Sequence, residues 1–371
     1  MRIAQIAPLF EAVPPPFYGG TERVVGGLCE ELVRRGHEVT LFASGDSRTS
    51  ARLHAIIPRS LRTSMSREEM LKIAPDLHDE LFATVYSRAD EFDIIHSHVE
   101  YRMEYNLPYA RTTSVPTVTT MHGVYDEERF PILERSFADA PFTSISLSQA
   151  RPMQAHHLNW VGCVYNSVPL DRFPFQPQPG DYLAFVGRIC PQKGPAAAVE
   201  VALRTGLKLK VGAKIDDYDW QYWKDEIEPL FETDQVEFLG EVDEREKTEL
   251  MGNAYATLLP INWPEPFGLV MVESLACGTP VIALNRGAVP EIIRDGVGGF
   301  VCDSVDQMVA AVGRVSELDR RTCRREAERF SPERMCAGYE EIYRQLIAGQ
   351  ATTAEFARQG QPQALQLGAA S

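Results

Sequence analysis

The sequence lacks the features that mark several classes of protein. Its seven cysteines are odd in number and include no C-x-x-C pair, so they indicate neither a disulfide framework nor a zinc knuckle. No stretch approaches the ~20 apolar residues of a membrane span, and the start, "MRIAQIAPLF", has too short an apolar run for a signal peptide. Basic residues are in the minority, with 37 Lys and Arg against 52 Asp and Glu and a formal net charge of -15. This balance argues against nucleic acid as the main partner. We therefore expect a cytoplasmic protein, and the composition leaves peripheral contact with the inner face of a membrane open.

The chain has 371 residues, more than the ~250 to 300 at which one hydrophobic core stops growing, so we expect two domains. Short apolar runs alternate with amphipathic segments, the pattern of helices that cover a parallel sheet. In the first half, strands are predicted in "RIAQIAP", "HEVTLFAS", "FDIIHSH", "TVTTMHG", "FTSISLS" and "GCVYNSV". In the second half, they are predicted in "YLAFVGRI", "LKLKVGA", "VEFLGEV", "YATLLPI" and "PVIAL". The predicted fold is α/β, with two doubly wound, Rossmann-like domains that face a central cleft.

Composition also predicts where the domains divide. The proline-rich stretch "NSVPLDRFPFQPQPGD" has little periodicity, which is typical of a linker. We expect an N-terminal, acceptor-side domain over residues 1–166, a linker over 167–180 and a nucleotide-sugar-binding domain over 181–330. A helix over 331–347 is expected to pack back on the first domain, and the Ala- and Gln-rich tail, 348–371, is expected to be disordered.

Two glutamates lie close together in the stretch "INWPEPFGLVMVESLACGTPVIALNRG". A helix is predicted to begin near Phe267 or Gly268, and its first N–H groups and positive dipole end suit a phosphate or a hydroxyl-rich ligand. Glu265 precedes this helix and can accept hydrogen bonds from sugar hydroxyls, while Glu273 lies inside it and can accept two from a diol such as ribose. The alternative is that Glu265 caps the helix and Glu273 is a solvated helix residue.

The run "EPFGLVMVE", followed by "ACGTPVIA" and "GAVPEII", resembles the E-x7-E signature of the family-4 retaining glycosyltransferases, enzymes with the GT-B fold. Further segments resemble other parts of that family. "GGTERVVGGLCEELVRRGHEVTLFA" is similar to its first helix, "TTMHG" to its mid-domain histidine turn, "FVGRICPQKG" to its phosphate-binding turn and "NSVPLDRF" to its interdomain linker. The motifs occur in family order over roughly residues 2–345, which makes the resemblance more specific than any single motif. The linker departs from the family in having Asn166-Ser167-Val168 where relatives often have Asn-Gly-Val.

The resemblance implies a retaining hexosyltransferase. Such an enzyme moves a hexose from a nucleotide diphosphate sugar, for example UDP-glucose or GDP-mannose, to a hydroxyl of a sugar, lipid or small-molecule acceptor. It implies no metal and no other cofactor, because the nucleotide sugar is a co-substrate. A nucleotide-sugar epimerase and a non-catalytic sugar-nucleotide-binding protein stay open as alternatives. The first does not explain the E-x7-E together with "GRICPQKG", and the second would be expected to lose some of the residues His122, Arg188, Lys193 and Glu265.

Four residues are the predicted catalytic set. Arg188 and Lys193 follow the first strand of the second domain, and two cations in a water-poor cleft can stabilise a departing diphosphate. Either cation alone would be interpreted as a surface residue near a turn. The resemblance implies the same role for the pair, places His122 beside the 6-position of the transferring sugar, and assigns the 3- and 4-hydroxyls of that sugar to Glu265.

The remaining predicted contacts are with the donor. Gly19 and Gly20 stand where a strand's loop enters a helix, so a ligand can approach their backbone, although the G-x-G-x-x-G fingerprint of nicotinamide-binding proteins is absent. The resemblance places the nucleotide base near Gly212, Gly240 and Val242. The complete set of predicted donor-binding residues is Gly19, Gly20, Gly212, Gly240, Val242, Phe267, Gly268, Leu269, Val270 and Glu273.

Three features leave other interpretations open. His96, His98 and His122 end two predicted strands and could converge on a metal, although no carboxylate or Cys at ligand spacing accompanies them. A D-x-D within Asp216–Asp219 could hold a metal on a nucleotide diphosphate, but a solvated loop is the simpler interpretation. The arginines of the segment 48–67 could meet an anionic lipid or a phosphorylated acceptor, or could form a solvated face.

Overall fold

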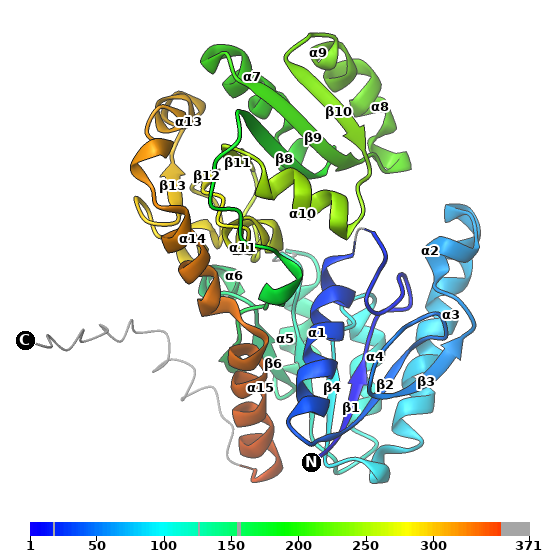
Figure 1. Ribbon diagram of the computed structural model, residues 1–371. Helices are drawn as coiled ribbons and strands as arrows, with labels where there is room; N and C mark the ends of the chain where they lie inside the picture. The colour runs from blue at the N-terminus through cyan, green and yellow to red at the C-terminus, as the bar shows by residue number, and fades with distance from the viewer. Residues whose placement is uncertain (18, 125–126, 154–156, 350–371) are drawn as a thin grey trace, which may run out of the picture.

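The computed structural model describes residues 1–17, 19–124, 127–153 and 157–349. From residue 350 on, the tail that is predicted to be disordered therefore lies outside the described residues. Two α/β units follow one another along the chain, and Figure 1 shows the second above the first.

The first sheet consists of β1 (Arg2–Ile6), β2 (Glu38–Ser44), β3 (Arg52–Ile57), β4 (Ile94–Ser97), β5 (Thr117–Thr120), β6 (Pro141–Ser144) and β7 (Asn159–Cys163). These strands are parallel and lie in the order β3-β2-β1-β4-β5-β6-β7. All four residues of β4 and of β5 are buried, because helices cover both faces of a parallel sheet.

The second sheet consists of β8 (Tyr182–Arg188), β9 (Lys208–Lys214), β10 (Val236–Gly240), β11 (Ala256–Leu259), β12 (Val281–Leu284) and β13 (Gly299–Cys302). Its strands are also parallel, in the order β10-β9-β8-β11-β12-β13. Each sheet thus starts in its middle and reverses direction once, which is the doubly wound topology. The predicted fold class is confirmed.

The helices of the first unit are α1 (Gly20–Arg34), α2 (Leu61–Ser64), α3 (Arg67–Tyr86), α4 (Met103–Ala110), α5 (Phe130–Phe137) and α6 (Leu147–Met153). Those that follow are α7 (Pro195–Thr205), α8 (Trp220–Tyr222), α9 (Glu228–Phe231), α10 (Glu244–Gly252), α11 (Leu269–Ala276), α12 (Val289–Ile292), α13 (Val305–Val312), α14 (Arg320–Ala327) and α15 (Pro332–Ile347). None of the helices that the structure describes is both long and apolar enough to cross a bilayer.

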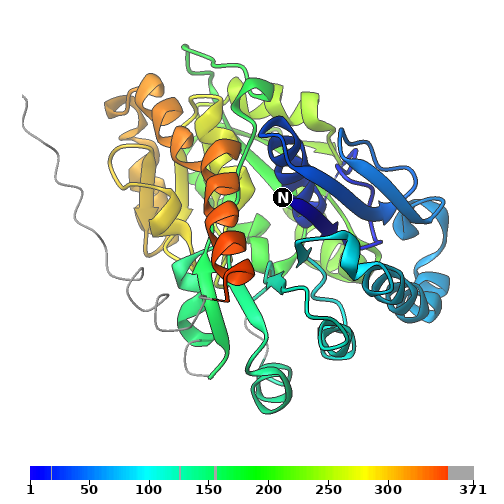
Figure 2. The same ribbon diagram turned by 90° about the horizontal axis from the view of Figure 1, so that it is seen from below.

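The last helix returns to the first sheet. Figures 1 and 2 show α15 beside α1, away from the second sheet. Its side chains Cys336, Tyr339 and Tyr343 are fully buried in the same core as Val25 and Leu28 of α1. Residues far apart in the sequence therefore form one core.

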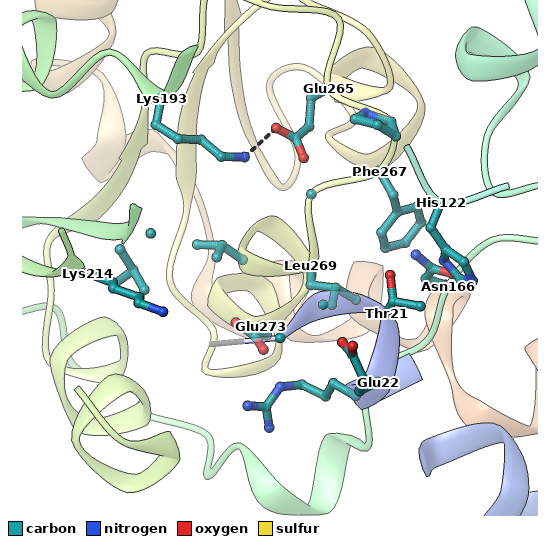
Figure 3. Close-up of a pocket in the computed structure, with 18 of the residues that line it drawn as sticks. Thr21, Glu22, His122, Asn166, Lys193, Lys214, Glu265, Phe267, Leu269 and Glu273 are labelled. Atoms are coloured by element: carbon teal, nitrogen blue, oxygen red, sulfur yellow. Dashed lines mark hydrogen bonds and ion pairs between the residues drawn. The ribbon is translucent and has the colours of Figure 1, made fainter. Parts of the chain in front are cut away.

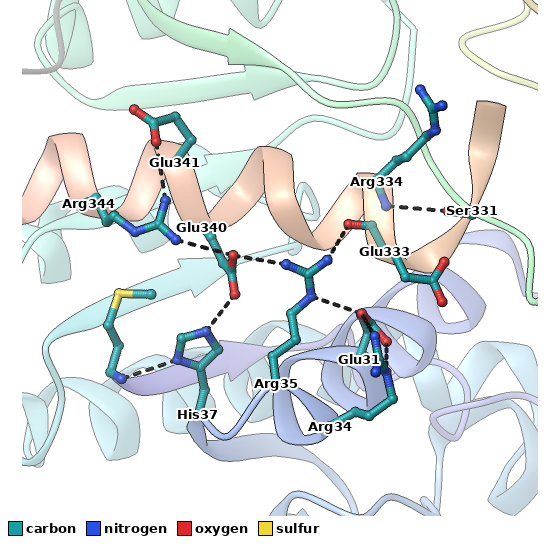
Figure 4. A network of polar contacts seen from close by, with 11 residues as sticks. Glu31, Arg34, Arg35, His37, Ser331, Glu333, Arg334, Glu340, Glu341 and Arg344 are labelled. Atoms are coloured by element: carbon teal, nitrogen blue, oxygen red, sulfur yellow. Dashed lines mark hydrogen bonds and ion pairs between the residues drawn. The ribbon is translucent and has the colours of Figure 1, made fainter. Parts of the chain in front are cut away.

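A polar network closes the edge of this contact (Figure 4). Arg35 follows α1 and pairs with Glu340 of α15 at 3.1 Å, and it also donates to the backbone oxygen of Glu333 at 2.7 Å. His37 approaches the other oxygen of Glu340 at 2.8 Å. These contacts fix α15 against the turn between α1 and β2. The predicted limits of the domains themselves stay a prediction, while the two sheets end and begin at Cys163 and Tyr182.

Candidate functional site

A cavity of about 490 Å³ lies between the two units. Its lining follows the carboxyl ends of β1, β4 and β5 on one side and of β8, β9 and β11 on the other. Both sheets reverse their strand order at these strands, and doubly wound folds bind ligands at such a point. All predicted site residues except Arg188 and Gly240 are in the lining, namely Gly19, Gly20, His122, Lys193, Gly212, Val242, Glu265, Phe267, Gly268, Leu269, Val270 and Glu273.

The amino end of α11 opens into this cavity. Gly268 precedes the helix with a left-handed φ of 83°, and a Cβ at this position would lie 2.6 Å from the side chain of Met271 and 3.3 Å from that of Glu265. A glycine is therefore required here for both conformational and steric reasons. The first N–H groups of α11 have no partner within the helix and lie next to the cavity, where they favour an anionic group.

Glu265 is held from two sides. Its backbone oxygen accepts from the N–H of Ala288 at 2.8 Å, and a Cβ on Gly287 would lie 2.3 Å from that oxygen. Its side-chain Oε2 accepts from Lys193 Nζ at 2.6 Å and from Trp263 Nε1 at 2.8 Å. Glu265 is only 7% exposed. Figure 3 shows this ion pair at the upper edge of the cavity.

Glu273 is a buried member of the lining and not a solvated helix residue. It is 2% exposed, and its Oε1 accepts from Lys247 of α10 at 2.5 Å. Its other oxygen, Oε2, is buried and has no hydrogen-bond partner within the part of the chain that the structure describes. A buried acceptor of this kind costs free energy until a donor reaches it. A ligand with hydroxyl groups can supply that donor.

Arg188, in contrast to Lys193, is not among the residues that line the cavity. Its guanidinium pairs with Asp216 at 3.4 Å and lies 5.2 Å from the ring centre of Tyr218. Arg67, at the start of α3, faces the same ring from the first domain at 5.4 Å. Gly240 ends β10, and its successors Glu241 and Val242 are in the lining in its place. The roles predicted for Arg188 and Gly240 stay predictions.

His122 belongs to a buried chain of hydrogen bonds. The amide oxygen of Gln5 lies 2.9 Å from His98 Nε2, and the amide nitrogen of Gln5 donates to the Tyr343 hydroxyl at 3.0 Å. His98 Nε2 must then carry the ring proton, so its Nδ1 accepts, and it lies 2.9 Å from His122 Nε2. Burial lowers the pKa of His122 to about 3 and holds the pKa of His98 well below its usual value. With both rings neutral, His122 donates from Nε2 and keeps the lone pair on Nδ1.

Two family models match the chain one after the other. "Glycosyltransferase Family 4" matches residues 18–172, and "Glycosyl transferases group 1" matches residues 170–330. The chain belongs to glycosyltransferase family 4. The family predicted from the E-x7-E run and its companion motifs is confirmed.

Individual relatives of this glycosyltransferase are distant. A phosphatidyl-myo-inositol mannosyltransferase of Mycobacterium leprae (strain TN) is 26% identical over 341 residues, which are 86% of this chain and 87% of the relative. A glycogen synthase of Mycobacterium tuberculosis (strain ATCC 25618 / H37Rv) is 24% identical over 378 residues, which are 88% of this chain and 89% of the relative.

Solved structures of other proteins share its GT-B fold. Sucrose-phosphate synthase from Thermosynechococcus elongatus has a TM-score of 0.76 and 19% identity, with 94% of this chain and 99% of that chain covered. Alr3699/HepE of Anabaena, in complex with UDP and glucose, has a TM-score of 0.72 and 16% identity, with 93% and 100% covered. The two domains therefore have the arrangement of this fold.

The alternative metal sites of the glycosyltransferase are occupied by other interactions. His96 contacts the Tyr343 hydroxyl through Nδ1 and Thr120 Oγ1 through Nε2, both at 2.6 Å. Asp216 is paired with Lys214 at 3.1 Å as well as with Arg188. Among the described residues, no group of three or more His, Cys, Asp or Glu is placed to hold a metal ion. Independence from metal stays a prediction.

Sequence reasoning missed several ionisable residues of the lining, among them Glu22, Glu100 and Lys247. Glu22 lies in the first turn of α1, and Glu100 follows β4 by a few residues. The rule that ligands bind beyond the carboxyl ends of strands could have found Glu100. Lys247 lies within α10, and nothing in its local sequence distinguishes it from other surface lysines.

Proposed function

We propose that the protein is a retaining glycosyltransferase that moves a hexose from a UDP- or GDP-linked donor to an acceptor hydroxyl without a metal. One observation carries this proposal: the amino end of α11, the Lys193–Glu265 pair and the unpartnered oxygen of Glu273 meet in one cavity between two doubly wound domains. An anion site, a cation and two carboxylates match the diphosphate and the two sugars of such a donor.

Each of these groups has a proposed part. The diphosphate lies at the amino end of α11, next to the backbone of residues 267–270, and Lys193 neutralises it. The ammonium of Lys193 has three donors, so it can contact the diphosphate without leaving Glu265. Glu265 binds the 3- and 4-hydroxyls of the hexose, and the free oxygen of Glu273 accepts from a ribose hydroxyl. The part predicted for Arg188 is tested by mutation below.

His122 and the leaving group complete the proposed chemistry. The lone pair of His122 Nδ1 accepts from the 6-hydroxyl of the hexose. The transition state resembles an oxocarbenium ion, as in glycoside chemistry generally, and the charge that develops on the diphosphate is stabilised by Lys193 and α11. The acceptor hydroxyl attacks from the side on which the diphosphate leaves and transfers its proton to that diphosphate.

The relatives do not decide the acceptor or the nucleotide base. One is named a phosphatidyl-myo-inositol mannosyltransferase, another a glycogen synthase, and a third a D-inositol 3-phosphate glycosyltransferase. A solved structure of the same fold contains UDP and glucose. Thermal-shift measurements with UDP, GDP and ADP identify the base, because a ligand that binds the folded protein raises the melting temperature by mass action.

The proposal is tested by incubating the protein with labelled nucleotide sugars, with EDTA and, separately, with Mn²⁺. We expect release of nucleoside diphosphate in EDTA, faster with an acceptor, and a product that keeps the anomeric configuration of the donor when analysed by NMR. An epimerised donor, binding without turnover, an inverted product, or activity that requires Mn²⁺ would each contradict the proposal in a different part.

A further inference from the structure

Two glutamates and two arginines, Arg23 and Arg62, belong to the first-domain wall of the cavity. Glu22 and Glu100 line it, and Glu11 lies behind Gly19, where a Cβ would be 3.5 Å from the Glu11 side chain. Glu11 and Glu22 are 7% and 6% exposed. Burial raises the pKa of all three carboxyl groups, those of Glu22 and Glu100 to about 7. Burial therefore disfavours the ionised form of these three carboxyl groups.

Glu22 is the member of this group with a free side chain. Glu100 accepts from the N–H of Gly123 at 2.7 Å, and Glu11 pairs with Arg62 at 3.4 Å. The Glu22 carboxyl group accepts from its own backbone N–H, and it has no hydrogen bond or ion pair to the side chain of another residue that the structure describes. Figure 3 shows its carboxyl oxygens turned toward the cavity, next to Thr21. A buried carboxyl group whose only contact is with its own backbone keeps an oxygen available to a ligand.

The two arginines of this wall already have partners. Arg23 pairs with Glu244 of the second domain and donates to the backbone oxygen of Phe17 at 2.8 Å. Arg62 pairs with Glu11 and lies 5.7 Å from the ring centre of Phe10. The lysines of the lining, Lys193, Lys214 and Lys247, all belong to the second domain. On the first-domain wall, a phosphate on the acceptor would thus contact carboxyl groups and arginines that already form ion pairs.

We propose that the acceptor of this enzyme is an uncharged polyhydroxy compound, an unphosphorylated sugar or cyclitol, and that Glu22 binds one of its hydroxyls. The inference rests on the proposed function, because it concerns the acceptor half of the same cavity. A carboxyl group serves a hydroxyl in either protonation state, as acceptor when ionised and as both donor and acceptor when protonated. A phosphate dianion in the same place is repelled by Glu22 or Glu100 whenever either carboxyl group is ionised.

The first test compares neutral compounds with their own phosphates. The purified full-length chain and its preferred nucleotide sugar are incubated with glucose or glucose 6-phosphate, mannose or mannose 6-phosphate, and myo-inositol or myo-inositol 1-phosphate. Phosphatidylinositol vesicles form a further arm. We expect at least one neutral compound to raise nucleoside diphosphate release above the acceptor-free rate, and to do so at least tenfold more than its phosphate. The inference is overturned if a phosphate or the vesicles raise the release more than the neutral compounds do, or if none of the neutral compounds raises it.

The second test assigns the hydroxyl contact to Glu22. Glu22→Met keeps the length of the side chain and removes its hydrogen bonds, so the KM for the neutral acceptor should rise about tenfold while the donor KM stays within about twofold. Glu22→Gln restores a donor and an acceptor and should recover most of the loss. Glu30→Met makes the same change at an exposed position of α1 and should leave both constants unchanged.

The outcomes separate the two proposals. Acceptor-free hydrolysis of the donor tests the transferase itself, since it requires no acceptor and therefore no contact between Glu22 and an acceptor hydroxyl. If hydrolysis occurs and the acceptor KM of Glu22→Met equals that of the wild type, the role of Glu22 is wrong and the transferase stands. If Glu22→Gln fails to rescue Glu22→Met, the position needs its charge or its packing, and the hydroxyl contact is likewise wrong. If no nucleotide sugar is hydrolysed at all, the proposed function fails first.

Discussion

On the second-domain wall of the cavity each glutamate of the E-x7-E signature forms an ion pair with a lysine, whereas on the first-domain wall Glu22 forms no ion pair with the residues that the structure describes. Lys193 lies 2.6 Å from Glu265, and Lys247 lies 2.5 Å from Glu273. All four groups are at most about a fifth exposed. Glutamate side chains thus have two different environments within one cavity, with and without an ion pair.

This difference supports the ligands that we propose for each wall. An ion pair keeps a carboxylate ionised in a buried place, and a lysine with three donors can add a phosphate without losing its first partner. A lone buried carboxyl group resists ionisation and favours a neutral partner. The first arrangement suits a charged donor, and the second suits an uncharged acceptor.

The largest expected effect concerns the lone carboxyl group. Burial raises the pKa of Glu22 in the folded protein to about 7 from its ordinary value of 4.5. Between these values the folded protein binds more protons than the unfolded chain, so the wild type loses stability as the pH rises. Glu22→Gln does not titrate. The free energy of unfolding, variant minus wild type, should therefore rise by up to about 3 kcal/mol from pH 4.5 to 7 and stay level above that.

Chemical denaturation over this pH range measures the difference, and Glu30→Gln is the control. The pKa of Glu30 is lowered, because hydrogen bonds from Ser50 and Thr49 outweigh the effect of burial. The free energy of unfolding of Glu30→Gln minus that of the wild type should therefore not rise between pH 4.5 and 7. A Glu22→Gln curve parallel to that of the wild type would mean that Glu22 is ionised in the folded protein, and the contrast between the two walls would disappear.

The paired carboxylate of Glu265 should matter most for turnover. We expect Glu265→Ala to lower turnover at least about a hundredfold, the scale on which an enzyme loses one positioned transition-state contact. The thermal shift with nucleoside diphosphate should persist, because Lys193 and the amino end of α11 remain. Near-normal transfer by this variant would remove Glu265 from the reacting sugar.

The contrast between the walls also explains what the sequence could reveal. Glu265, Gly268 and Glu273 were predicted because a short spacing places the first two just before the start of one helix, α11, and the third inside it. Of their two lysine partners, the sequence predicted only Lys193. Lys193 belongs to a turn next to a strand, but the pairing of Lys247 with Glu273 joins two helices through tertiary packing. On the first-domain wall, Glu22 lies in the first turn of α1, whose sequence pattern is that of an ordinary amphipathic surface helix.

The two strands that were missed are edge strands. The fold was predicted because buried parallel strands are continuous apolar runs, yet β3 and β13 were not identified, and both lie at the edge of a sheet. β3 is partly exposed and contains arginine and histidine, so it lacks the apolar run. The orientation of Arg188 could not be predicted from the sequence either, because its partners Asp216 and Tyr218 lie 28 and 30 positions further along the chain.

A matched pair of variants tests that orientation. Lys193→Gln removes a cation from the lining and leaves Glu265 without its ion pair, so donor affinity should fall by at least about tenfold. Arg188→Gln removes a guanidinium that lies outside the lining, and the loss should be about threefold at most. Isothermal titration with the preferred nucleoside diphosphate measures both. Equal losses would show that Arg188 leaves Asp216 and contacts the diphosphate, as predicted from the sequence.

The smallest effect concerns the proton on His122, which no charged group controls. Gln5→Leu removes the amide oxygen that fixes the proton of His98, so both tautomers of His122 become accessible and the loss in kcat/KM should be about three- to fivefold. Tyr343→Phe removes a hydroxyl from the same network but leaves the contact between Gln5 and His98. Nitrogen-15 NMR of the histidine rings should show an unprotonated His122 Nδ1 in the wild type and in Tyr343→Phe, and a mixture in Gln5→Leu. If the ring signals of Gln5→Leu match those of the wild type, another group sets the tautomer, and Gln5 only fills space in the core.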